Sequence, residues 1–129
     1  MKREAVFLEP RELLCETAKI LDNKKALDIR AIDIEGVSIL ADYFLLASGT
    51  SSTQVKALAE EVEFRMSGLG VEPLRVEGEQ TASWIIMDYG SVVIHIFHTQ
   101  TREFFNLERL WADGKFLSLE EMTQTPTDK

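Results

Sequence analysis

The amino-acid sequence predicts an α+β fold, a single domain in which helices pack on a mixed β-sheet. Apolar residues recur at helical spacing in two separate segments, and an apolar run of strand length stands between them. Two further apolar strands flank the dipeptide Tyr89-Gly90, which is typical of a tight hairpin turn. At 129 residues the chain is long enough for one hydrophobic core and too short for two ordinary domains.

The first part of the chain is predicted to form a helix and two strands. Pro10 is a favourable first helical residue because it has no N–H to leave unpaired, and the helix is expected to end near Asn23. Its buried stripe is predicted to contain Leu13, Leu14, Thr17, Ile20 and Leu21. Residues 27–34 alternate apolar and charged side chains, which predicts a strand with one exposed side. Residues 43–47 are apolar throughout, which predicts a central strand covered on both faces.

A long second helix is predicted to follow the polar segment of residues 48–52. Ser51 and Gln54 have the spacing of a capping box, which satisfies free amides at a helix start. The face predicted to be buried contains Val55, Leu58, Ala59, Val62, Met66 and Leu69. A strand, a helix and a strand in succession predict a parallel crossover, so residues 74–77 are expected to join the same sheet.

The last part of the chain is predicted to contain a hairpin, a third helix and a tail. Residues 84–88 and 92–97 are the hairpin strands, and residues 100–111 form the helix. We assign residues 1–114 to the domain and residues 115–129 to a C-terminal tail that is partly disordered. The tail residues expected to pack back on the domain are Phe116, Leu117, Leu119 and Met122, whereas the polar segment from Thr123 to Lys129 is expected to fray.

Charge and composition restrict the possible partners. With 14 basic and 22 acidic residues, the net charge is −8, which disfavours direct binding to nucleic acid and favours a basic protein partner. Such an acidic balance is also common in soluble proteins that have no basic partner. No apolar run approaches the roughly 20 residues of a membrane helix, and the N-terminus lacks the apolar region of a signal peptide, so we expect a cytoplasmic protein.

The sequence offers little support for catalysis, a metal or a cofactor. The Gly-Ser segment of residues 48–52 lacks the ending of a Walker loop, and no Asp-x-Asp follows it. His95 and His98 are three residues apart in a strand and point to opposite faces, so they are not expected to share a metal ion. For His95 we favour a packed side chain with one hydrogen-bond partner. A nucleotide-using transferase with a degenerate site at residues 48–52 is the less favoured alternative.

Two tryptophans and a tyrosine are candidates for recognition. Trp84 and Tyr89 bury large areas and carry a polar group, as binding hot spots do, and we weigh an interface and a core position equally for both. Trp111 shares a helical stripe with Phe104 and Leu107, and such a stripe is more often core than interface.

The chain resembles the ribosomal silencing factor family, also called the RsfS or Iojap family. The resemblance covers roughly residues 13–113 and is specific because many motifs occur in order along one chain. The matching residues are Gly36, Ser38, Asp42-Tyr43-Phe44, Ser48-Gly49, Ser52, Glu77-Gly78, Trp84, Asp88-Tyr89-Gly90, Val93, His95, Arg102, Phe105, Leu107-Glu108 and Leu110-Trp111.

The resemblance implies a fold similar to nucleotidyltransferases but without their catalytic acids, and a homodimer in isolation. It implies a translation repressor, not an enzyme, that binds the large ribosomal subunit through its basic protein number fourteen and sterically blocks joining of the small subunit. An alternative use of the same interface is assembly of the large subunit. The binding residues that the resemblance implies are Trp84, Asp88 and Tyr89, with Glu77 and Glu79 nearby, and in second rank Arg102, Glu108 and Trp111.

Overall fold

The computed structural model describes residues 8–124 of the chain. Its helices are α1 (Pro10–Asn23), α2 (Ser52–Gly68), α3 (Thr99–Phe105), α4 (Leu107–Leu110) and α5 (Leu119–Thr123). Its strands are β1 (Leu27–Asp33), β2 (Tyr43–Gly49), β3 (Arg75–Glu77), β4 (Trp84–Asp88), β5 (Val92–His98) and β6 (Lys115–Ser118). Within the described residues, no helix has the length and apolar character needed to cross a membrane.

The strands form one six-stranded sheet in the order β3-β4-β5-β2-β1-β6. β2 and β5 pair in parallel, and the other neighbouring strands pair antiparallel. β3 therefore runs in the same direction as β2, as expected for the crossover from β2 through α2 to β3. The two strands are not neighbours, because β5 and β4 lie between them. This arrangement confirms the predicted α+β fold with a mixed sheet.

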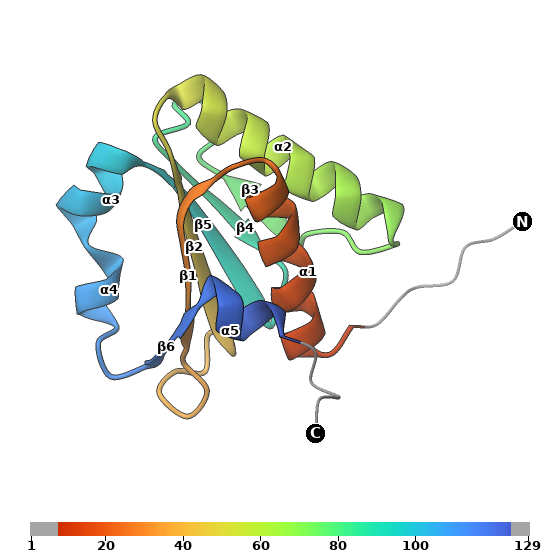
Figure 1. Ribbon diagram of the computed structural model, residues 1–129, viewed down its shortest axis with the longest axis vertical. Helices are drawn as coiled ribbons and strands as arrows, with labels where there is room; N and C mark the ends of the chain where they lie inside the picture. The colour runs from red at the N-terminus through yellow and green to blue at the C-terminus, as the bar shows by residue number, and fades with distance from the viewer. Residues whose placement is uncertain (1–7, 125–129) are drawn as a thin grey trace, which may run out of the picture.

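Helices cover the two faces of the sheet unequally. Figure 1 shows α1, α2 and α5 on one face and the short helices α3 and α4 on the other. The main hydrophobic core lies beneath α1 and α2, where Leu14, Leu21, Leu45 and Val55 are fully buried. A smaller core on the other face joins residues of the sheet to Leu107 of α4. Every residue of β2 is buried, which confirms a central strand covered on both faces.

The two long helices follow the sequence pattern closely. α1 begins at Pro10 and buries all five residues predicted for its inner face. At α2, the Ser51 hydroxyl accepts a hydrogen bond from the Gln54 N–H at 3.1 Å, as a capping box requires. The Gln54 side chain, however, accepts from the Thr50 N–H at 2.7 Å and not from that of Ser51. Leu69 lies just beyond the helix and is exposed, so its predicted burial is wrong.

The predicted third helix is interrupted. Asn106 has φ 49° and ψ 61°, the left-handed conformation, and it separates α3 from α4. Its side chain then accepts a hydrogen bond from the Arg109 N–H at 3.3 Å and begins the new helix. Asparagine adopts this conformation more readily than most residues because its short polar side chain bonds locally. As a result Phe104, expected on a buried stripe, lies exposed on α3.

The chain after Gly114 adds one strand to the sheet and one helix beside it. β6 pairs antiparallel with β1 at the edge of the sheet, and α5 begins with a capping box formed by Ser118 and Glu121. Leu117 and Met122 are buried in the main core, as predicted. Thr123 is the last residue of α5 and its hydroxyl donates to the Leu119 carbonyl at 2.8 Å, so the fraying expected from Thr123 does not begin there. Residues 125–129 lie outside the described residues, so the disorder expected there stays a prediction.

Candidate functional site

One face of the sheet stays uncovered over β3, β4 and the neighbouring part of β5. Side chains of β4 alternate between the two faces, as they must in a strand. Ile85 and Met87 are buried toward the helices, whereas Trp84, Ile86 and Asp88 are only half-buried on the opposite side. Because α3 and α4 lie over the other end of this face, the side chains near β3 remain accessible.

Strand register arranges the side chains of this open face in rows. The first row crosses β3, β4, β5 and β2 through Arg75, Asp88, Val93 and Phe44. The second row crosses the same strands through Glu77, Ile86, His95 and Leu46. Cross-strand neighbours on one face lie close enough to touch, so the register fixes which charged and apolar groups meet.

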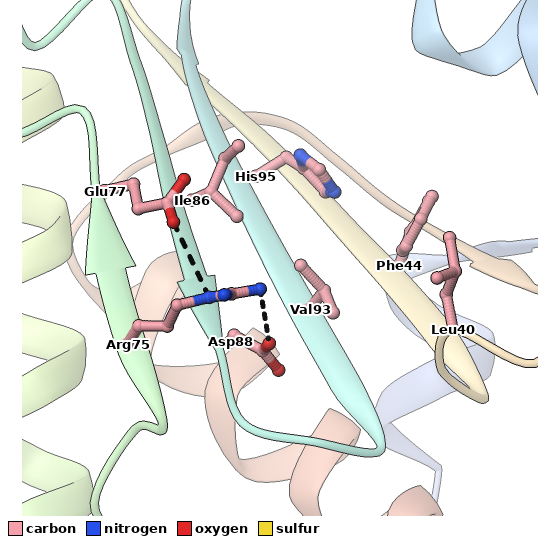
Figure 2. Close-up of a pocket in the computed structure, with 8 residues that line it drawn as sticks. All are labelled: Leu40, Phe44, Arg75, Glu77, Ile86, Asp88, Val93 and His95. Carbon is pink, nitrogen blue, oxygen red and sulfur yellow. Dashed lines mark ion pairs between the residues drawn. The ribbon is translucent and has the colours of Figure 1, made fainter.

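A hollow of about 220 Å³ lies over these rows, and we call it the open-face pocket. Figure 2 shows Phe44, Ile86 and Val93 projecting from the sheet into this region, with Leu40 at one end. The other lining residues are Arg75, Glu77, Asp88 and His95. The pocket thus has a mainly apolar floor and a charged border.

Asp88 has a defined orientation at this border. Its Oδ1 accepts a hydrogen bond from the Gly90 N–H at 2.8 Å, within the hairpin turn. Its Oδ2 lies 3.6 Å from Nη2 of Arg75, and the Arg75 Nε lies 3.5 Å from Oε2 of Glu77. The turn therefore holds one oxygen of Asp88, while the other faces the exposed guanidinium of Arg75.

His95 forms one wall of the pocket and is 6% exposed. The indole N–H of Trp84 donates a hydrogen bond to its Nδ1 at 3.1 Å, which confirms the predicted packed histidine with one partner. Burial lowers the pKa of His95 from 6.5 to about 4, so the imidazole is neutral near pH 7. Its Nε2 is buried and has no hydrogen-bond partner among residues 8–124.

Trp84 lies between the sheet and α3. Its ring stacks on Phe97 with centroids 4.9 Å apart and contacts Phe105 at the same centroid distance. The indole N–H at one edge of the ring donates to His95, and the Trp84 side chain remains partly exposed. Trp84 therefore packs against α3 and is also partly exposed on the open face, and its contact with a partner stays a prediction.

Tyr89 does not belong to the open face. It is 8% exposed, and its hydroxyl is buried. Burial and the negative charges of Glu63 and Glu72 raise the pKa of this hydroxyl. Tyr89 belongs to the main hydrophobic core, which lies on the helical side of the sheet. Of the two positions weighed for Tyr89, the structure shows the core position, and a contact of this residue with a partner stays a prediction.

Arg102, which is buried, and Glu108, which is partly buried, form a structural unit. The Arg102 guanidinium donates to Glu108 at 2.8 Å, to the Asp28 carbonyl at 2.7 Å and to the Ser48 hydroxyl at 2.9 Å. Burial alone would raise the pKa of Glu108, but the hydrogen bond and charge of Arg102 outweigh it and hold that pKa below its usual value. These groups connect α3 and α4 to the ends of β1 and β2, away from the pocket.

The remaining predicted binding residues are separated. Trp111 is half-buried and packs edge-on against Phe44, with ring centroids 5.2 Å apart. Glu79 is exposed in the loop between β3 and β4 and does not line the pocket. The structure therefore brings together Glu77, Asp88 and Trp84 on the open face, and leaves the others beneath or beyond it.

The polar segment before α2 has a local structural role. Ser48 is buried and accepts a hydrogen bond from Arg102, while Ser51 caps α2. In the part of the chain that the structure describes, no group of three or more His, Cys, Asp or Glu side chains is arranged to hold a metal ion.

Sequence reasoning missed Leu40 and Arg75 as pocket residues. Ile39 and Leu40 are large apolar residues in a connection between strands, and both are exposed. Such a pair was a usable signal for a contact surface. No comparable sequence signal identified Arg75, because its proximity to Asp88 depends on the register between β3 and β4.

Comparison with known proteins gives consistent matches over most of the chain. Residues 8–129 match the family described as "Ribosomal silencing factor during starvation". The chain is 39% identical over 113 residues to "Ribosomal silencing factor RsfS" of Bacillus subtilis (strain 168), which covers 88% of this chain and 96% of the relative.

Two further relatives extend this comparison. Over 100 residues, the chain is 32% identical to "Mitochondrial assembly of ribosomal large subunit protein 1" of Mus musculus, covering 75% of this chain and 44% of that protein. A crystal structure of a Chromobacterium violaceum protein superposes with a TM-score of 0.79 at 30% identity, covering 81% of this chain and 88% of that one.

Proposed function

Because the chain belongs to the ribosomal silencing factor family, we propose that it represses translation by binding the large ribosomal subunit and blocking the joining of the small one. The proposed partner is protein number fourteen of the large subunit, the basic protein that the family resemblance implies. In this role the protein acts in the cytoplasm by covering a surface of the large subunit, and it catalyses no reaction.

The observation that carries this proposal is the uncovered face around the open-face pocket. Protein interfaces commonly combine an apolar centre with a polar border, and this pocket has that arrangement. Its acidic residues, Asp88 and Glu77, complement a basic partner, and the net charge of −8 steers such a partner toward the protein. The same charge opposes contact with ribosomal RNA.

The structure supports a ranking of the binding residues that differs from the sequence-based one. Asp88, Glu77 and Trp84 are the leading contacts because they share the open face. Arg102, Glu108 and Trp111 act indirectly, by holding α3 and α4 in place beside it. Glu79 has a peripheral place at most.

Co-sedimentation with purified bacterial large subunits tests this surface. Asp88→Asn keeps the size of the side chain and its acceptor for the Gly90 N–H, but it removes the charge. We expect this variant to bind at least about thirtyfold more weakly, as is typical when one partner of a desolvated charge pair is removed. Glu60→Gln, an exposed acid on α2, is the control with the same change in net charge. Equal binding of Asp88→Asn and wild type would refute the proposed surface.

Assembly of the large subunit is a second candidate, favoured by the name of the mouse relative. The two uses differ in what happens to mature subunits. A silencing factor added to purified subunits lowers the yield of joined ribosomes, whereas an assembly factor leaves that yield unchanged and its depletion causes incomplete large subunits to accumulate. A gradient analysis of both experiments separates them.

The proposed homodimer of the free protein requires a separate measurement. Phe104 and Leu110 are 80% and 74% exposed on α3 and α4, and they provide apolar surface for such a contact. Light scattering over a concentration series gives the mass of the free protein. A mass of one chain, 14.6 kDa, at all concentrations would exclude the dimer.

A further inference from the structure

We propose that Arg75 is an internal ligand of the open-face pocket, which occupies Asp88 and Glu77 in the free protein and gives way to a basic side chain of the partner. This inference rests on the proposed function and names the group that the pocket receives. That group is the side chain of a lysine or an arginine in the basic ribosomal protein.

Arg75 and Asp88 are held with very different firmness. Asp88 has a 23% exposed side chain and is fixed by the hydrogen bond from Gly90, so its second oxygen is a stationary acceptor. The Arg75 side chain is 68% exposed, and its nitrogens lie 3.5 and 3.6 Å from the two carboxylates. These distances exceed the 2.7–3.2 Å range of N–H···O hydrogen bonds, so the guanidinium is held only by weak ion pairs. The cation can therefore leave without disturbing the acceptor.

The pocket also has a place for a second basic side chain. Figure 2 shows Arg75 reaching Asp88 from β3, while Val93, Phe44 and Leu40 lie on the opposite side of Asp88. Leu40 is exposed and Val93 is half-buried, so these two residues form the accessible part of this apolar strip, while Phe44 is buried beside them. Lysine and arginine lay their methylene groups on apolar surface and keep the charged head at its border. A partner side chain on this strip would bring its cation to Oδ2 of Asp88.

Charge at the border favours a cation from outside. Arg75 neutralises only one of the two carboxylates, Asp88 and Glu77, which leaves a net negative border beside the apolar floor. His95, on the pocket wall, is neutral near pH 7 and adds no positive charge. An acidic side chain would be repelled by these carboxylates, and a neutral donor could bond to one of them without balancing its charge. Displacing Arg75 costs every partner the ion pairs that Arg75 makes with Asp88 and Glu77. Only a cationic partner group replaces those ion pairs, which is a source of specificity.

Binding of four full-length variants to purified bacterial large subunits tests the inference. Arg75→Gln removes the internal ligand and should tighten binding by about threefold to fivefold, the upper part of the range for an exposed ion pair. Arg65→Gln is the matched control, because Arg65 has a 58% exposed side chain and an ion pair with Glu61, but it lies on α2. It changes the net charge equally and should leave the affinity within about twofold of wild type. In the Asp88→Asn background, Arg75→Gln should give no gain.

The outcomes separate this inference from the proposed function. Wild-type binding together with weaker binding of Arg75→Gln would overturn the inference alone, because Arg75 would then contact the partner directly. Equal tightening by Arg65→Gln would also overturn it, since the effect would come from net charge. Absence of wild-type binding would overturn the proposed function and the inference with it. Thermal unfolding of each variant verifies that the fold is retained.

Discussion

Acidification from pH 7 to pH 5 is expected to destabilise the protein by about 2 kcal/mol through His95 alone. In the folded protein, burial holds the pKa of His95 at about 4. In the unfolded chain, the imidazole is in water and has its ordinary pKa of about 6.5. Between these values the unfolded state binds more protons than the folded state, so the free energy of unfolding falls as the pH falls.

The size of the effect follows from the two pKa values. At pH 5 the unfolded imidazole is mostly protonated and the folded one is mostly neutral, which favours unfolding by a factor of about 30 relative to a neutral histidine. The cost approaches about 3 kcal/mol at pH 4. For a chain of this length, 2 kcal/mol corresponds to a Tm lowered by about 7 °C.

Urea unfolding of wild type and His95→Asn at pH 7 and pH 5 measures this contribution. Asparagine can still accept the Trp84 N–H near the position of Nδ1, but it does not titrate. The variant is expected to lose about 2 kcal/mol less than wild type between the two pH values, because the carboxyl groups titrate in both proteins. An equal loss in both would show that the folded protein protonates His95 as readily as the unfolded chain, which would refute the effect of burial.

Three further predictions concern stability and are measured by thermal or urea unfolding. Arg102→Leu leaves Glu108 without its main partner and should cost about 3 kcal/mol, with part of it recovered in the double variant Arg102→Leu/Glu108→Leu. Gly78→Ala should cost at least about 2 kcal/mol, because φ is +89° and the new Cβ would lie 2.1 Å from the Trp84 carbonyl oxygen. Gly68→Ala is the control and should cost nothing, because no atom lies within 4 Å of its new Cβ. Asn106→Ala should cost about 1–2 kcal/mol, whereas Asn106→Gly should be nearly neutral because glycine accepts the left-handed conformation.

The sequence was sufficient to predict elements whose structure depends on local pattern. Pro10 and the capping residue Ser51 identified the starts of the long helices, and the uninterrupted apolar run identified β2 as central. The break at Asn106 was missed because the apolar spacing continues across it. Only the left-handed backbone of that one residue separates α3 from α4.

The candidate site was less predictable, because it depends on which strands are neighbours. Trp84 and Asp88 were predicted as contacts from the family resemblance, and strand alternation puts them on one face. Tyr89 follows Asp88 directly and was grouped with it, but the chain turns its ring to the opposite side. Arg75 meets Asp88 only through the pairing of β3 with β4, which no local pattern specifies.

The rows of side chains on the open face have a thermodynamic consequence for association. Each row is carried by strands whose other face is locked against α1 and α2, so most of its backbone entropy was lost when the chain folded. Aside from the exposed side chains of Arg75, Glu77 and Leu40, a partner meets groups that already hold their positions. Little further ordering is required when the complex forms. A stable complex can therefore have a smaller interface than one in which a disordered segment must fold on binding.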